Sequence, residues 1–346
     1  MTMADVTIMG AGVFGLALAL VCAERGARVH VIEKRHIGAG SSGGLVGALA
    51  PHVPENWNDK KAFQFEALRM AASFWARVAG VSGVDPGYAR LGRVQPVSAD
   101  ALALAHARAD NAAHLWKGFA TWQVMRAQDA PGLPLVTPSG WVIHDTLSAR
   151  LHPRRAGQAL AGAVQALGGT ISTGEVPQGD GLTVWATGHE GLDDLSAALG
   201  RPIGSGVKGQ SILLRHASPD APQIFADGLH IVPHADGTVA IGSTSEREFT
   251  DAAGVDGQCD TLLARARATC PALQDAPVIE AWAGVRPRAK SRAPLLGAWP
   301  GREGHFVFNG GFKIGFAMAP VLAGCMADLV LEGRDTIPQG FGFSAL

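Results

Sequence analysis

Charged residues are scarce in this sequence, and neither sign of charge is in excess. They make up 17% of the 346 residues, and the formal net charge is −1. Because proteins that bind nucleic acid or anionic membranes usually carry a basic surface, this balance argues against both kinds of partner. The 47% of apolar residues indicates a globular chain that is long enough for two domains. We therefore expect a small molecule as the partner of this protein, which would act alone or as a homo-oligomer.

Cysteine is also rare, with four residues spread over the chain and no C-x-x-C pair. This spacing gives no zinc signature and no dense disulfide framework. His230 and His234 are four residues apart, but Pro233 lies between them in an expected strand, so we predict no metal site. Unpaired, mostly buried thiols are typical of a reducing compartment, and we predict a cytoplasmic protein. The cysteines are Cys22, Cys259, Cys270 and Cys325.

One long uncharged run, residues 6–23, has the length of a transmembrane helix but not its other features. Acidic Asp5 precedes it instead of a basic cluster, and three glycines interrupt its first half. It divides naturally into a strand at 6–9 and a helix at 13–24, and a second strand follows at 28–33. The run therefore predicts the start of an α/β domain.

Glycine is abundant, with 45 residues, and three of them form the pattern GAGVFG between the first strand and the helix. Gly10 permits a tight turn, Gly12 lets a pyrophosphate approach the helix N-terminus, and Gly15 lets helix and strand pack closely. The free amides and the helix dipole at that end favour phosphate groups. Glu33 ends the next strand and is placed to accept hydrogen bonds from ribose hydroxyls. We predict a dinucleotide site here, lined by Gly10, Gly12, Val13, Phe14, Gly15, Glu33 and Lys34.

The remaining chain alternates between helix patterns and short apolar strands. The Gly-rich segment 34–55 is expected to be a loop that touches the ligand. Helices are expected near 62–79, 100–117, 153–167, 261–269 and 316–331, and strands near 92–97, 140–145, 182–186, 210–216, 279–286 and 305–309, with a hairpin around Asp236-Gly237.

This order predicts an α/β fold with a discontinuous Rossmann-like dinucleotide-binding domain and an inserted, mostly antiparallel β domain. We predict that residues 4–80, 146–205 and 288–335 form the first domain. Residues 85–145 and 206–287 are predicted to form the second, which would bind the substrate.

Four motifs resemble those of the FAD-dependent D-amino acid oxidase family, and they occur in the same order. They are GAGVFG…VIEK, VWATG, WAGVRP and FNGGFKIGFAMAP. The runs VKGQ, HIVPHADGTVAIGST and APLLG are especially similar to glycine oxidases of thiamine biosynthesis. The resemblance covers nearly the whole chain and implies noncovalently bound FAD. It further implies that the following residues contact the cofactor: Ser41, Ser42, Gly47, Val176, Ala186, Thr187, Gly188, Gly311, Phe312, Lys313, Ile314 and Gly315.

Three charged or titratable residues are candidates for catalysis. Arg286 ends an apolar strand and needs an anion there, either an internal acid or, as the resemblance implies, the substrate carboxylate. Lys313 precedes the last helix and either stabilises charge on the flavin or is solvated. His230 stands where glycine oxidases have a tyrosine, and it either steers the substrate amine or is a half-buried sheet residue. Lys313-Ile314 likewise replaces Arg-Asn, which leaves the identity of the amine open.

The resemblance implies an oxidoreductase that oxidises an amino acid or secondary amine of the glycine, sarcosine or D-amino acid type. Hydride would pass to flavin N5, the product would be an imine or oxo acid, and O2 would be reduced to H2O2. The alternative is a stand-alone oxidase related to the enzyme that modifies the wobble uridine of tRNA, whose loop the segment SSGGLVGALAP resembles. An NAD-dependent dehydrogenase and a flavin-binding sensor without turnover are further alternatives.

Overall fold

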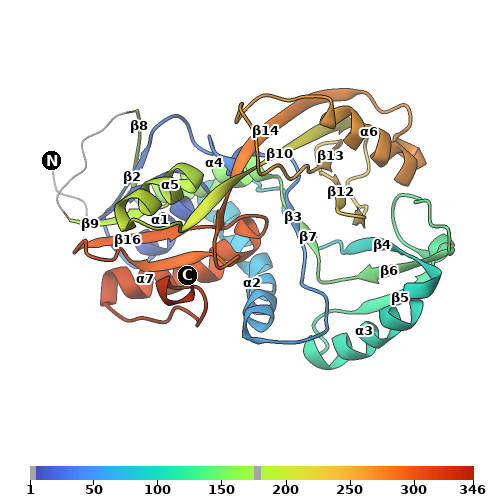
Figure 1. Ribbon diagram of the computed structural model, residues 1–346, viewed down its shortest axis with the longest axis horizontal. Coiled ribbons are helices and arrows are strands. Elements are labelled where there is room, and N and C mark those ends of the chain that lie inside the picture. The colour runs from blue at the N-terminus through green and yellow to red at the C-terminus, as the bar shows by residue number, and fades with distance from the viewer. Residues whose placement is uncertain (1–4, 175–180) are drawn as a thin grey trace.

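The structure is a computed structural model that describes residues 5–174 and 181–346. Two sheets dominate it, and Figure 1 shows them in opposite halves of the molecule, with helices clustered around the smaller sheet. The chain moves between the sheets several times, so each sheet is assembled from separate stretches of sequence. This arrangement confirms the predicted α/β fold class.

The smaller sheet has six strands in the order β15-β16-β9-β1-β2-β8. All neighbours are parallel except β15, which pairs antiparallel with β16. Its central strand β1 is apolar and buried, as expected for a parallel strand covered on both faces. The strands are β1 (Val6–Met9), β2 (Val29–Glu33), β8 (Thr170–Thr173), β9 (Leu182–Trp185), β15 (Leu295–Ala298) and β16 (His305–Asn309).

Four helices pack on one another beside this sheet, and a fifth, α5, packs against β16 and the larger sheet. The four helices are α1 (Val13–Glu24), α2 (Asp59–Ser82), α4 (Pro153–Ala166) and α7 (Gly315–Glu332), and α5 spans Gly188–Leu199. Helix α1 carries almost no polar side chain because it is buried on most sides. Among the described residues, α7 is the one helix that is long and apolar enough to cross a membrane, but it packs against α1 and α2.

The larger sheet has eight strands in the order β14-β10-β13-β12-β11-β4-β6-β5. Its pairs are antiparallel except β11 with β4. The strands are β4 (Arg93–Val97), β5 (Trp122–Arg126), β6 (Trp141–Asp145), β10 (Gly204–Arg215), β11 (Gln223–Ala226), β12 (Leu229–Pro233), β13 (Thr238–Gly242) and β14 (Val278–Ala289). Helices α3 (Leu102–Leu115) and α6 (Gln258–Thr269) pack on it, and a short pair of strands, β3 (Ala48–Leu49) and β7 (Ala149–Arg150), lies apart.

Strands β10 and β14 are the longest, with 12 residues each, and Figure 1 shows them running from the larger sheet towards the smaller one. Their far ends contact α5, which belongs to the other half of the molecule. The expected strands and helices are all present, although the predicted helix at 100–117 is shorter. Helix α5 and strands β5, β11 and β15 were not predicted. The exact domain boundaries stay a prediction.

Candidate active site

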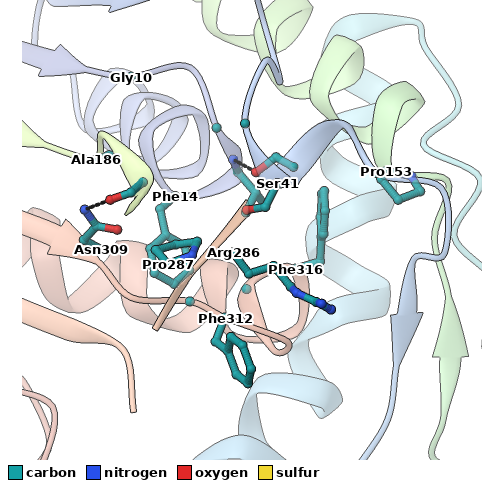
Figure 2. Close-up of a pocket in the computed structure, with 18 of the residues that line it drawn as sticks. Gly10, Phe14, Ser41, Pro153, Ala186, Arg286, Pro287, Asn309, Phe312 and Phe316 are labelled. Carbon is teal, nitrogen blue, oxygen red and sulfur yellow. Dashed lines mark hydrogen bonds between the residues drawn. The ribbon is translucent and has the colours of Figure 1, made fainter. Parts of the chain in front are cut away.

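A cavity of about 550 Å³ lies where the two halves meet. It extends from the carboxyl ends of β1 and β2, where Gly10 and Glu33 lie, to His230 and Arg286 on the larger sheet. Figure 2 shows Arg286, Phe312 and Phe316 grouped together on the side away from Gly10. The cavity therefore joins the glycine turn of the smaller sheet to residues of the larger sheet.

The three predicted glycines build the turn at one end of this cavity. Gly10 has a φ of +106°, and a Cβ atom there would lie 2.5 Å from the carbonyl oxygen of Ala186. At Gly15 a Cβ atom would lie 2.0 Å from the carbonyl oxygen of Gly10. Neither backbone oxygen has room to yield, so only glycine fits both positions. Gly10 and Gly12 line the cavity, and Gly15 packs under Gly10.

Two polar side chains hold the backbone around this turn. The Glu33 carboxylate accepts hydrogen bonds from the amides of Ala11 at 2.8 Å and Arg35 at 3.0 Å. The Ser42 hydroxyl accepts a hydrogen bond from the Val13 amide at 3.0 Å, at the start of α1. The first-turn amides of a helix have no intrahelical partner and attract anionic groups. This end of the cavity is therefore shaped and polarised for phosphate and ribose.

Arg286, on β14, is held at the other end by three hydrogen bonds. Its Nη1 donates to Ser243 Oγ at 2.8 Å, and its Nη2 donates to the carbonyl oxygens of Thr244 at 2.6 Å and Lys208 at 3.2 Å. Burial lowers the pKa of Arg286 to about 10, although nearby Glu246 opposes that shift. Within the described part of the chain, the guanidinium makes no salt bridge and its buried Nε has no partner. It is therefore a fixed cation that lacks an anion.

His230 also lines the cavity, and its imidazole is neutral. Burial lowers its pKa to about 3, and the neighbouring charges of Arg93 and Lys313 act in the same direction. Its ring packs 4.6 Å from the ring of Phe225, and its buried Nδ1 has no partner among residues 5–174 and 181–346. A neutral ring with a free nitrogen can donate or accept one hydrogen bond to a bound molecule.

Lys313 precedes α7 and lies beside Phe312, whose ring centroid is 5.7 Å from Lys313 Nζ. Burial lowers the pKa of Lys313, and the positive charges of Arg286 and Arg288 lower it further. The turn 311–315 brings Lys313 and the first amides of α7 to the cavity wall.

The structure brings nearly all predicted site residues to this one cavity. Gly15 and Ile314 support it from outside: Gly15 packs under Gly10, and the Ile314 carbonyl accepts the first α7 hydrogen bond, from Met318. Val176 lies outside the described residues. Those on the cavity wall are Gly10, Gly12, Val13, Phe14, Glu33, Lys34, Ser41, Ser42, Gly47, Ala186, Thr187, Gly188, His230, Arg286, Gly311, Phe312, Lys313 and Gly315.

Sequence reasoning missed several other residues of the wall. Trp282 lies on the same face of β14 as Arg286, four residues away, and that alternation was a usable signal. Asn309 donates to the Gly188 carbonyl at 2.8 Å and accepts from the Gly310 amide, which fixes the two turns against each other. Ser243, which directly follows β13, accepts a hydrogen bond from Arg286, and no local sequence pattern indicated this contact.

Residues 5–329 match the family model described as FAD dependent oxidoreductase. The chain belongs to this family. Glycine oxidase of Geobacillus kaustophilus (strain HTA426) is 27% identical over 376 residues, which cover 96% of this chain and 94% of that protein. The bifunctional protein ThiO/ThiG of Trichormus variabilis is 25% identical, and the match covers 98% of this chain and 55% of that protein.

Solved structures share the fold over almost the whole chain. The crystal structure of glycine oxidase from Geobacillus kaustophilus has a TM-score of 0.85 at 23% identity and covers 99% of this chain and 98% of its own. Iminodiacetate oxidase from Chelativorans sp. BNC1 has a TM-score of 0.83 at 21% identity, with coverage of 97% and 98%. The match to the family model confirms the predicted family and, with it, the prediction of FAD as the cofactor, and the solved structures confirm the fold.

The cavity fits this cofactor on its own geometry. Gly10 and Gly12 line the cavity and have no side chain to fill it, and Glu33 and the start of α1 offer acceptors and donors suited to ribose and phosphate. The turn 311–315 at the start of α7 lines the same cavity. The four cysteines are unpaired, and among the described residues no cluster of His, Cys, Asp and Glu is suited to a metal.

Proposed function

We propose that this protein oxidises an amino acid or a secondary amine that carries a carboxylate, with molecular oxygen as the final electron acceptor and hydrogen peroxide as a product. The observation that carries the proposal is Arg286, a buried guanidinium on the cavity wall with no acidic partner among the described residues. A planar guanidinium suits bidentate binding of a carboxylate.

The groups that contact the Arg286 guanidinium support this assignment. Ser243, Thr244 and Lys208 use neutral oxygens to orient the guanidinium, so its full positive charge is kept for the substrate. Neutral His230 faces the same space, and it adds no charge that would repel a protonated amine. FAD, when bound, supplies the acceptor for a hydride, which carries the two electrons of the oxidation. The protein then contributes orientation of the substrate and exclusion of water.

The names of the similar proteins fit the same chemistry. Glycine oxidase and iminodiacetate oxidase are both named for amines that carry at least one carboxylate. We also propose that the protein works in the reducing cytoplasm on a small molecule, as a monomer or a homo-oligomer, since its four thiols are unpaired.

The decisive test is anaerobic reduction of the bound flavin. Glycine, sarcosine and D-alanine are mixed with the FAD-loaded protein without oxygen, and loss of the flavin absorbance near 450 nm is followed. We expect bleaching by at least one of these amines, with peroxide formed when air is admitted. Methylamine, which lacks the carboxylate, should bleach poorly. A flavoprotein that no amine reduces would refute the proposal.

The role of Arg286 is tested by Arg286→Met with Arg201→Met, an exposed arginine, as the control. Loss of a buried, hydrogen-bonded charge that pairs with a ligand costs roughly 2–5 kcal/mol, or about 30- to 5000-fold in kcat/KM. The control should leave kcat/KM unchanged. Equal activity of Arg286→Met and the wild type would show that another group binds the carboxylate.

A further inference from the structure

Three positive side chains surround the ring of Phe312. Arg286 Cζ lies 5.7 Å, Arg288 Cζ 5.6 Å and Lys313 Nζ 5.7 Å from the ring centroid. The Phe312 backbone is fixed in the left-handed region with a φ of +42°, and its amide donates to the Pro287 carbonyl at 3.0 Å. Three cations therefore lie within 5.7 Å of the centroid of one aromatic ring beside the cavity.

None of these three cations has a carboxylate partner in the described residues. Glu246 is the acid whose charge acts on Arg286, but it lies 3.8 Å from Lys208 Nζ and also binds Gln210 and Thr244. Two other buried or half-buried arginines are paired with acids, in Arg93–Asp145 and Arg108–Glu55. The positive charges at the cavity end have no such carboxylate partner among the described residues.

One substrate carboxylate would not neutralise this cluster. Arg286 and Lys313 line the cavity, whereas Arg288 contacts the ring without reaching the wall. If Arg286 binds one carboxylate, Lys313 and Arg288 still place two positive charges in a partly buried region, where burial and the charges of Arg286 and Arg288 lower the pKa of Lys313. A second anion beside Lys313 would remove the repulsion between these charges and hold the ammonium in its charged form.

Resting on the proposed amine oxidation, we propose that the preferred substrate carries two anionic groups, one bound by Arg286 and the other by Lys313 Nζ, with Arg288 adding to the local field. The substrate class is an amino acid with an acidic side chain or an amine with a second carboxylate. A preference for such substrates would distinguish this protein from an oxidase that accepts only glycine. It also assigns Lys313 to the substrate, whereas the sequence placed it beside the flavin.

Isosteric pairs of substrates isolate the second charge. The FAD-loaded protein is assayed with D-aspartate against D-asparagine and D-glutamate against D-glutamine, because the members of each pair differ mainly in charge. A hydrogen bond to a charged group favours the acidic member by about 10- to 150-fold in kcat/KM. Binding is measured separately with succinate and succinamate, which are not oxidised, through the change they cause in flavin absorbance.

Variants then locate the second anion. Lys313→Met should reduce the acid-to-amide ratio in kcat/KM and in binding at least tenfold, and Lys313→Arg should largely keep the ratio. Arg288→Met should reduce it less. Lys290→Met, an exposed lysine on the next loop, is the control for general surface charge and should leave the ratio unchanged.

Two results would overturn this inference. The first is a wild-type protein that does not discriminate between succinate and succinamate. The second is a Lys313→Met variant that lowers acid and amide activities equally, because Lys313 would then act through the flavin. If no amine bleaches the flavin, the proposed oxidation fails, but tighter binding of succinate than succinamate would still report a second anion site.

Discussion

A single methyl group at Gly209 should disconnect Arg286 from its support. Gly209 lies on β10, where it pairs with Gly284 of β14, and its φ lies outside the left-handed region. A Cβ atom at this position would lie 1.9 Å from Arg286 Nη2 and 2.5 Å from Cζ. The backbone conformation therefore accepts alanine, but the guanidinium must move, and the Thr244 carbonyl oxygen, 3.0 Å from the new atom, must shift slightly.

The size of the effect follows from these distances. Nη2 must move by about 1.5 Å before it reaches an ordinary contact distance of 3.4 Å from the new methyl group. That movement breaks the hydrogen bonds to the carbonyls of Thr244 and Lys208. Since a misplacement of about 1 Å costs roughly 100-fold, we expect kcat/KM for a carboxylate-bearing amine to fall about 100-fold in Gly209→Ala. The free energy of unfolding should fall by about 1–3 kcal/mol, because the guanidinium loses hydrogen bonds and the Thr244 carbonyl must shift slightly.

Stopped-flow reduction of the flavin under anaerobic conditions gives both the rate and the apparent dissociation constant of the amine. Urea denaturation gives the free energy of unfolding of the same samples. Gly257→Ala is the matched control, because a Cβ atom there meets nothing within 4 Å. If Gly209→Ala binds and oxidises the amine as well as the wild type does, the position of the Arg286 guanidinium does not determine substrate binding.

Further predictions concern the nucleotide end and the response to pH. Gly15→Ala should lower the free energy of unfolding by roughly 1–3 kcal/mol, because the methyl group meets the Gly10 carbonyl, and the purified protein should lose its yellow colour on desalting. Glu33→Gln should weaken FAD about 10- to 100-fold in a fluorescence titration, and an unchanged affinity would exclude a role for its charge. Burial lowers the pKa of His230 to about 3 and of His234 to about 4, below the ordinary histidine value of about 6.5, so the unfolded chain binds protons that the folded chain does not. The free energy of unfolding should therefore fall as pH drops below about 6.5, by about 2 kcal/mol per histidine at pH 5. Glutamine at both positions should flatten this slope in urea titrations at pH 7.5 and 5.

Local patterns were sufficient to predict the nucleotide end of the site. The strand 6–9, the glycine turn and Glu33 all fall within 28 consecutive residues, so their spacing alone fixes how they meet. A role for Arg286 could also be predicted from the sequence, because an arginine at the end of a buried strand needs an anion. What could not be predicted was which oxygens hold it, since Ser243 is 43 residues away and reaches it only through the order of strands in the sheet.

The missed elements have physical reasons as well. Helix α5 begins with glycine at Gly188 and contains Gly191, which has poor helix propensity. Gly191 is required nevertheless, because a Cβ atom there would lie 1.9 Å from Thr187 Oγ1. The buried Leu192 and Leu195 gave a helical signal at a spacing of three. The convergence of Arg286, Arg288 and Lys313 on Phe312 depends on a left-handed Phe312, which no sequence pattern indicated.

The position of β1 has a consequence for biosynthesis. This strand is the first of the chain, yet its neighbour β9 is more than 170 residues later, and β9 in turn pairs with β16 near the C-terminal end. Helix α1, which follows the glycine turn, packs against α7, which is synthesised after all the strands named above. The nascent chain therefore has to keep this apolar helix from aggregating until α7 has been synthesised.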